Sequence, residues 1–315
     1  MSQASLSSLI WSVADLLRGD YKPHEYGRVI LPFTVLRRLD CVLAPTKAAV
    51  LAELAAKEAL GINPQPFVER ITGVPFANTS ALDLRTLMGD QDNLAANLTA
   101  YIQGFSPAVR DVFERFLFAE QIARLAKSGL LYKVTEKFAG FNLHPDAVNN
   151  HDMGLAFEEL IRKFAEISNE TAGEHFTPRE VIRLMVNLLF IEDSEILTPG
   201  NPVVRTIYDP TAGTGGMLSV AGEHLLAHNP AAALTMFGQE LNDESYAICK
   251  ADMLIKGQDV RNIVPGNTLS EDGHAALSHL LKSRGPQGTM NVYQCPFCHG
   301  WHIGHAPRNG ALRRR

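Results

Sequence analysis

The sequence has few cysteines and no long apolar run. Four cysteines occur in 315 residues, and the isolated Cys41 and Cys249 do not indicate a disulfide framework. No stretch reaches the roughly 18 apolar residues that a membrane-spanning helix needs. The first residues lack a basic start and carry Asp15 inside an apolar stretch, which predicts an amphipathic helix rather than a secretory signal. We therefore expect a cytoplasmic protein with no membrane partner.

Clustered positive charge is also scarce. The formal net charge is −5, and only Arg313–Arg315 form a basic run. Proteins that bind DNA without a partner protein usually neutralise several phosphates with grouped Lys and Arg side chains. A DNA enzyme with this balance is expected to gain affinity from a partner. A protein that does not bind DNA is equally consistent with this net charge.

Apolar periodicity divides the chain into three segments. Residues 1–145 predict a helical N-terminal domain, which either docks on a partner or only completes the fold. Within it we expect a helix over 47–60, a Pro/Gly loop over 61–80 and one helix carrying both Val109 and Leu117.

Residues 146–285 have a different pattern, in which short apolar runs alternate with helices. Strands are expected at 203–209, at 234–240 and within 262–269, with helices at 217–229 and 242–257. Such alternation predicts an α/β domain with a parallel sheet. Residues 286–315 form a separate tail that contains cysteine and histidine.

A glycine-rich turn follows the first expected strand. The sequence DPTAGTGG, residues 209–216, lies between a strand and a helix, where open α/β sheets bind ligands. It is not the dinucleotide fingerprint, because Leu218 stands where the third glycine belongs. It is not a P-loop either, because the chain has no Gly-Lys pair. A turn with only a structural role remains an alternative.

The second expected strand ends in an acid. Glu240 follows the glycine turn by about 25 residues. A carboxylate at the tip of the neighbouring strand can accept hydrogen bonds from both hydroxyls of a ribose. Without a dinucleotide fingerprint, this combination favours S-adenosyl-L-methionine as the ligand. An exposed strand-end carboxylate without a ligand is the alternative.

Four segments in order carry a family resemblance. GEHFTPRE within 151–189, DPTAGTGGML at 209–218, GQELNDESYAICKADMLIKG at 238–257 and PGNTL at 265–269 resemble the modification subunit of type I restriction systems, an adenine-specific (N6) DNA methyltransferase. The resemblance implies a helical N-terminal domain followed by a partial Rossmann-like methyltransferase domain that uses S-adenosyl-L-methionine. It also implies three partners: a specificity subunit, a restriction subunit and, through the complex, double-stranded DNA.

The resemblance assigns the cofactor-binding residues. TPRE also predicts, from the residues alone, a capping box and a helix start that favours a carboxylate; a start with no ligand is the alternative. Asn267 is expected near the adenine of the cofactor. The implied cofactor residues are Glu174, His175, Phe176, Thr177, Pro178, Arg179, Asp209, Gly213, Thr214, Gly215, Gly216 and Glu240.

The motif that carries out the transfer in this family is missing. It is Asn-Pro-Pro followed by Phe or Tyr, whereas this chain contains no Pro-Pro pair. No catalytic residue is therefore assigned, and the chain alone is expected to be inactive. One alternative is a non-enzymatic remnant that docks on restriction-system partners. Another is a protein-glutamine methyltransferase, which uses the same motif but does not predict GEHFTPRE.

The tail departs from the family pattern, which suggests a fusion or a shifted reading frame. Cys295 and Cys298 form half of a zinc-ribbon signature, and His302 and His305 could complete one zinc site. The spacing is tighter than in known zinc fingers, and a tail that binds no metal is the favoured alternative.

Overall fold

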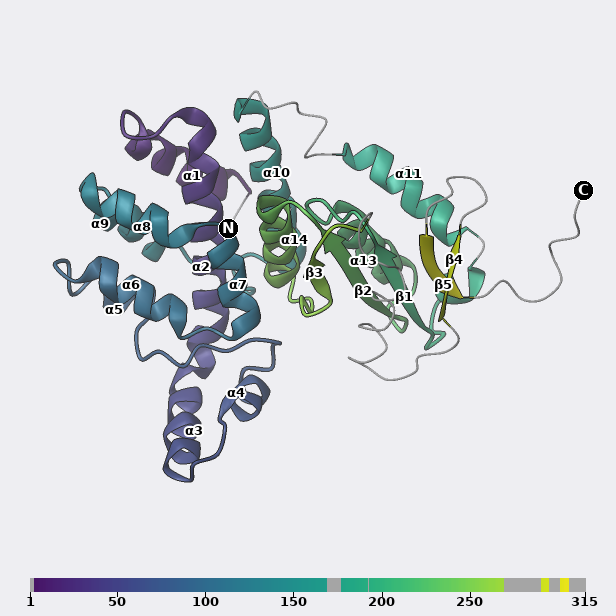
Figure 1. Ribbon diagram of the computed structural model, residues 1–315, viewed down its shortest axis with the longest axis horizontal. Helices are drawn as coiled ribbons and strands as arrows, with labels where there is room; N and C mark the ends of the chain where they lie inside the picture. The colour runs from purple at the N-terminus through teal and green to yellow at the C-terminus, as the bar shows by residue number, and fades with distance from the viewer. Residues whose placement is uncertain (1–2, 169–176, 192, 269–289, 295–300, 306–315) are drawn as a thin grey trace, which may run out of the picture. The chain divides into compact units, whose positions relative to one another are not determined.

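A computed structural model describes residues 3–168, 177–191, 193–268, 290–294 and 301–305 of the protein (Figure 1). The chain divides into two compact units. The first comprises residues 1–182, 213–216 and 243–261, and the second comprises residues 183–212, 217–242 and 262–315. The predicted domain boundaries near residues 145 and 285 stay predictions.

The first unit is helical. Besides two short 3-10 turns, η1 (Pro23–Glu25) and η2 (Ala44–Thr46), its helices are α1 (Gln3–Leu17), α2 (Tyr26–Leu43), α3 (Lys47–Ala59), α4 (Gln65–Thr72), α5 (Leu84–Leu87), α6 (Leu94–Gln103), α7 (Pro107–Arg115), α8 (Phe118–Lys127), α9 (Leu131–Ala139), α10 (Asn150–Ser168) and α14 (Asp243–Ile255). None of the described helices is both long enough and apolar enough to cross a membrane.

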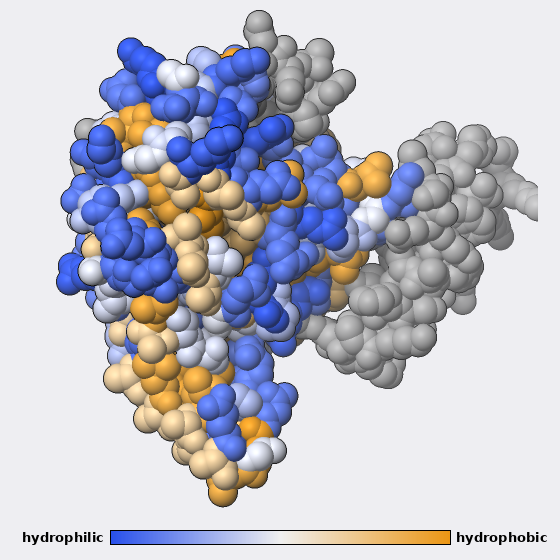
Figure 2. Space-filling model, turned by 60° about the vertical axis from the view of Figure 1, so that its left-hand side comes forward, coloured by the Kyte–Doolittle hydropathy of each residue, from blue (hydrophilic) through white to orange (hydrophobic). Residues whose placement is uncertain are grey.

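Helix α2 lies at the centre of the core of the first unit. Val29 and Phe33 are completely buried. The Phe33 ring lies 5.0 Å from that of Phe118 in edge-to-face geometry and stacks on that of Phe138 at 5.2 Å. Each fully buried apolar side chain of this size contributes about 1.5–3 kcal/mol. By contrast, α3 is rich in alanine, and Leu60 and Ile62, which follow it in the sequence, are exposed. Figure 2 shows mostly apolar surface at the lower end of the molecule, where Figure 1 shows α3.

Two expectations about this unit were wrong. The expected loop over 61–80 contains α4, because Pro64 and Pro66 stand at the helix start and Gly73 ends it at a φ of 67°. The expected helix through Val109 and Leu117 is two helices. Leu117 lies between α7 and α8 at a φ of 52°, so its side chain leaves the buried face and is 53% exposed.

Helix α14 is held in the first unit by a polar cluster. Its Lys250 is only 4% exposed, and Lys250 Nζ lies 2.7 Å from Asp111 Oδ2 on α7. The hydroxyl of Tyr246 donates to the same oxygen at 2.7 Å and accepts from Lys250 at 2.9 Å. Burial of Asp111 opposes ionisation, but the hydrogen bonds from Lys250 and Tyr246 outweigh it and lower the pKa of that carboxyl. The buried ammonium therefore has a paired, ionised partner.

The second unit contains the expected parallel sheet. Strands β1 (Val204–Asp209), β2 (Ala233–Glu240) and β3 (Ile263–Pro265) pair in the order β1-β2-β3. Helix α13 (Gly216–His228) connects β1 to β2, while α11 (Arg179–Phe190) and α12 (Ser194–Leu197) precede β1. The α/β prediction is confirmed, and each predicted strand and helix is present to within a few residues.

The tail contains an antiparallel pair that the sequence did not predict. Strand β4 (Met290–Gln294) pairs with β5 (Trp301–His305), with Tyr293 opposite His302 and Met290 opposite His305.

The Asp111–Lys250 pair is testable by substitution. Asp111→Asn leaves the buried ammonium of Lys250 without its counter-charge, so we expect a loss of about 1–3 kcal/mol of unfolding free energy. Urea unfolding at neutral pH measures this loss. Arg18→Gln, which breaks the exposed pair with Asp15, is the control and should change stability by less than about 0.5 kcal/mol. Equal effects of the two substitutions would contradict the anchoring role of Lys250.

Candidate functional site

The carboxyl ends of the three parallel strands lie along one edge of the sheet in the second unit. Asp209 ends β1 beside Gly238, and Glu240 ends β2 beside Pro265. The loops after these strands are also joined. The N–H of Ala212 donates to Gln239 O at 2.9 Å, and that of Gly266 donates to Glu240 O at 3.0 Å. The edge therefore presents a fixed set of backbone and carboxylate groups.

The loop after β3 also reaches the first strand end. The hydroxyl of Thr268 donates to the carbonyl oxygen of Pro210, directly after Asp209. Because Asn267 precedes Thr268, it belongs to the loop that this hydrogen bond holds. Its expected position near an adenine stays a prediction.

The surroundings of Asp209 disfavour the ionised form of its carboxyl group. Burial, together with the nearby negative charge of Glu240, raises the pKa of its carboxyl, although a hydrogen bond from the N–H of Thr211 at 3.1 Å opposes this. The same hydrogen bond orients the start of the glycine turn. Two carboxylates on adjacent strand ends favour a cationic or hydroxyl-bearing ligand over an anionic one.

Glu240 has a local role in the turn after β2. Its Oε1 accepts the N–H of Asn242 at 2.8 Å, which fixes the turn after β2. An ionised carboxylate can accept further hydrogen bonds through its remaining lone pairs. The geometry therefore suits both a ribose ligand and a strand-end acid that only holds a turn.

The glycine turn needs glycine for two different reasons. Gly213 has a φ of 55° and faces open space, whereas Gly215 has a φ of 85° and lies against α14. A Cβ at Gly215 would sit 2.7 Å from Cys249 Sγ, and one at Gly216 would sit 2.7 Å from Ile182 Cδ1 in the first turn of α11. Within the first unit, the turn therefore contacts both α14 and the start of α11.

The segment predicted to cover the cofactor is only partly described. Glu174, His175 and Phe176 lie outside the described residues. Helix α11 begins at Arg179, one residue later than TPRE predicts, and the carbonyl of Pro178 accepts the N–H groups of Val181 and Ile182 at 3.0 and 3.1 Å.

The described part of this segment has one strong side-chain contact. Thr177 and Pro178 are exposed, whereas the guanidinium of Arg179 forms an ion pair with Glu158 of α10. Glu158 also pairs with Lys256 of α14 at 3.0 Å. Within the first unit, Arg179 therefore ties the start of α11 to α10. A cofactor contact by Arg179 stays a prediction.

Two features of the site were missed from the sequence. Gln239 is 1% exposed, and its Oε1 accepts the hydroxyl of Tyr208 at 3.0 Å, which ties the ends of β1 and β2 together. In the sequence Cys249 is only an isolated cysteine, yet it packs on the glycine turn. The role of Gln239 was predictable in part, because a buried polar side chain inside a strand needs a hydrogen-bond partner. The cysteine contact had no comparable signal.

The predicted zinc site remains a prediction. Cys295 and Cys298 lie outside the described residues, and His302 and His305 lie on β5. The part of the chain that the structure describes contains no group of three His, Cys, Asp or Glu side chains placed to hold a metal ion.

Two protein-family models match consecutive parts of the chain. The model described as HsdM N-terminal domain matches residues 6–138, and the model described as N-6 DNA Methylase matches residues 148–295. The junction between them lies near the change in sequence pattern at residue 145.

Curated relatives belong to the same class. The methylase subunit of the type I restriction enzyme MjaIX from Methanocaldococcus jannaschii is 21% identical over 79% of this chain and 45% of its own length. That of EcoEI from Escherichia coli is 30% identical over 38% of this chain and 24% of its own length. The chain thus matches less than half of the length of either relative.

Two solved structures share the fold. The methyltransferase subunit of a type I restriction-modification system from Streptococcus thermophilus has a TM-score of 0.63 at 21% identity, covering 87% of this chain and 60% of that one. A modification subunit from Vibrio vulnificus has a TM-score of 0.54 at 18% identity, covering 85% and 56%.

The two reasons for glycine in the turn can be separated by substitution. Gly213→Ala meets only the unfavourable φ and should cost about 1–2 kcal/mol of unfolding free energy. Gly215→Ala adds a collision with Cys249 Sγ, so it should cost more, by about 1–3 kcal/mol. Urea unfolding of both variants and of Gly215→Ala/Cys249→Ala measures the difference. Equal losses for the two single variants, or no rescue in the double variant, would contradict the packing of the turn on α14.

Proposed function

Since this chain belongs to the family of modification (methylase) subunits of type I restriction systems, we propose that it binds S-adenosyl-L-methionine as the cofactor-binding part of a DNA adenine (N6) methyltransferase. The observation that supports this most directly is the pair of carboxylates, Asp209 and Glu240, on adjacent strand ends.

The residues present suit this cofactor. Burial and the negative charge of Glu240 raise the pKa of Asp209 and so disfavour its anion. The positively charged ammonium of the cofactor would stabilise that anion. The Glu240 carboxylate suits the ribose hydroxyls, and the open space at Gly213 allows close approach to the backbone. The remaining proposed cofactor residues are those of 174–179 and Thr214, Gly215 and Gly216. When bound, the cofactor supplies an electrophilic methyl group.

The methyl transfer needs groups that this sequence does not contain. Asn-Pro-Pro-aromatic residues position and polarise the target amine and stack on the flipped base, whereas this chain has no Pro-Pro pair. We therefore assign it cofactor binding and no catalytic residue. The specificity and restriction subunits and double-stranded DNA are its proposed partners, and the net charge of −5 agrees with DNA affinity gained through the complex.

A non-enzymatic role is the second candidate. A remnant that only docks on restriction-system partners fits the well-packed helical unit and the exposed apolar residues Leu60 and Ile62. Cofactor binding to the purified chain separates the two candidates. The docking remnant does not bind the cofactor.

Substitutions at the strand ends test the cofactor site. Glu240→Ala should weaken S-adenosyl-L-methionine binding by about 1–3 kcal/mol through lost charge-assisted hydrogen bonds. Isothermal titration calorimetry measures it, with Asp259→Asn as the control in a carboxylate that pairs with Arg261 and is not among the proposed cofactor residues. An unchanged affinity for Glu240→Ala would remove that residue from the site.

Asp209→Asn should separate stability from binding. Because the folded-state pKa of Asp209 is raised, its ionised form costs stability at neutral pH, and this cost disappears as the pH falls below the unfolded value. The variant should therefore unfold at an equal or higher urea concentration at pH 7 and match the wild type at about pH 3. Its cofactor affinity should nevertheless fall. A destabilised variant that keeps full affinity would show that Asp209 has only a structural role.

Methyl transfer is tested with the partners present. The chain, a specificity subunit and the cofactor should give no adenine methylation above background, because the amine-polarising motif is absent. Tritium incorporation into double-stranded DNA measures it, with a modification subunit that carries Asn-Pro-Pro-Phe as the positive control. Turnover by this chain under those conditions would mean that other residues perform the transfer.

A further inference from the structure

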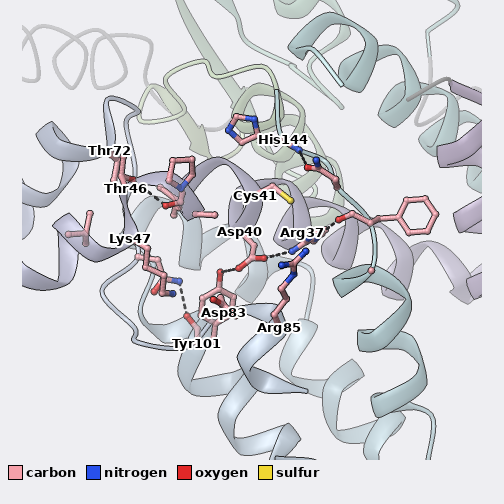
Figure 3. A pocket seen from close by; sticks show the side chains of 18 residues that line it. Arg37, Asp40, Cys41, Thr46, Lys47, Thr72, Asp83, Arg85, Tyr101 and His144 are labelled. Atoms are coloured by element: carbon pink, nitrogen blue, oxygen red, sulfur yellow. Dashed lines mark hydrogen bonds and ion pairs between the residues drawn. The ribbon is translucent and has the colours of Figure 1, made fainter. Parts of the chain in front are cut away.

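The helical unit contains a partly open cavity whose lining residues lie far from the glycine turn in the sequence. It has a volume of about 520 Å³ and lies between the end of α2, the starts of α3 and α5, α6 and the segment after α9. Cavities of about 300–1,000 Å³ are typical of small-molecule sites. Figure 3 shows that the side chains around this hollow are largely charged or polar, unlike those of a simple packing gap in a core. The charged and hydrogen-bonding groups of the lining include Arg37, Asp40, Lys47, Asp83, Arg85 and Tyr101.

The carboxylates of the cavity already have partners. Asp40 is 6% exposed; its Oδ1 accepts the hydroxyl of Tyr101 at 2.7 Å and the N–H of Leu84 at 3.3 Å, and its Oδ2 accepts from Arg37 at 2.5 Å. Asp83 Oδ1 caps α5 by accepting the N–H of Thr86 at 2.7 Å. Both acids therefore serve the fold.

The cationic side chains of the cavity have N–H groups that are not used in hydrogen bonds within the described residues. Arg37 uses Nε for the carbonyl of Phe141 at 2.6 Å and one terminal nitrogen for Asp40, and among the described residues its other terminal nitrogen bonds no acceptor. Lys47 donates to the carbonyl of Leu82 and keeps further N–H groups. Within the same part of the chain, the Arg85 guanidinium makes neither a hydrogen bond nor an ion pair, and Figure 3 shows it directed toward Arg37 and Asp40.

The cavity thus contains three cationic side chains and two carboxylates, and both carboxylates already accept hydrogen bonds from the protein. Burial lowers the pKa of Lys47 even though Asp83 and Asp40 oppose this, so its ammonium lacks full charge compensation. We propose that this cavity is a binding site for a small anion carrying carboxylate or phosphate groups, held by Arg37, Lys47 and Arg85. Such a ligand would accept the unused N–H groups in a charge-assisted, partly desolvated setting, where these bonds are strongest.

The site is distinct from the proposed cofactor site. All of its residues lie between positions 37 and 144, and the strand-end carboxylates are not among them. The two ligands also differ in the charge that their sites prefer, an anion here and a cationic ammonium beside Asp209. A loss of one binding event therefore need not affect the other.

Titration of the full chain with inorganic pyrophosphate and, separately, with citrate tests the proposal at constant ionic strength. Calorimetry should show one saturable site, and the tighter of the two probes identifies the phosphate or the carboxylate class. Arg85→Gln and Lys47→Gln should each weaken that binding at least about tenfold. Arg70→Gln, an exposed arginine outside the cavity, and Glu240→Ala should leave it unchanged.

Arg85 lines the cavity and is exposed, so its substitution tests binding without threatening the fold. Lys47→Arg keeps the charge and should retain most of the affinity. Failure of both probes to saturate would overturn the proposal, as would equal binding by the wild type and the Lys47→Gln/Arg85→Gln variant. Binding that weakens equally in Arg70→Gln would also overturn it, because it would show a general charge effect.

Discussion

The packing of the glycine turn on α14 is the contact on which the candidate site depends. Gly215 has no side chain, and α14 fills that space with Cys249. The helix is fixed in turn by the buried Lys250, whose ammonium is neutralised by Asp111 on α7. A buried charge tolerates little displacement, because losing its partner exposes the full desolvation cost. Within the first unit, the conformation of the turn is therefore tied to α14 and, through Lys250 and Asp111, to α7.

Charge is distributed unevenly between the two proposed sites. The strand ends carry two carboxylates close enough for Glu240 to raise the pKa of Asp209, whereas the helical cavity has an excess of N–H donors. A net charge of −5 hides both features, because it averages over the whole chain. Local partners, such as the Tyr101 hydroxyl on Asp40, decide which groups remain available to a ligand.

Much of the α/β part could be predicted from sequence, because strand and helix periods differ and the turn chemistry is local. The strands ending at Asp209 and Glu240 are examples, and the order of these elements along the chain implied a parallel sheet. The helical segment was harder. Prolines near residue 65 indicated a loop, although proline is also favoured at a helix start, and nothing local revealed the positive φ of Leu117.

Long-range contacts escaped prediction for a different reason. Asp111 and Lys250 are 139 positions apart, and neither carries a pattern that names the other. Tyr101 and Asp40 likewise carry no pattern that predicts their contact, although their hydrogen bond joins α6 to α2 in the lining of the cavity. The resemblance predicts which residues bind the cofactor, but it does not predict the contacts that orient them.

Hydrogen exchange measured by mass spectrometry, with and without S-adenosyl-L-methionine, tests whether the cofactor binds at the strand ends. We expect slower exchange for peptides covering 209–216, 238–242 and 265–268, with 37–47 unchanged. No protection anywhere at saturating cofactor, or protection confined to residues outside these three segments, would contradict a cofactor site at the strand ends.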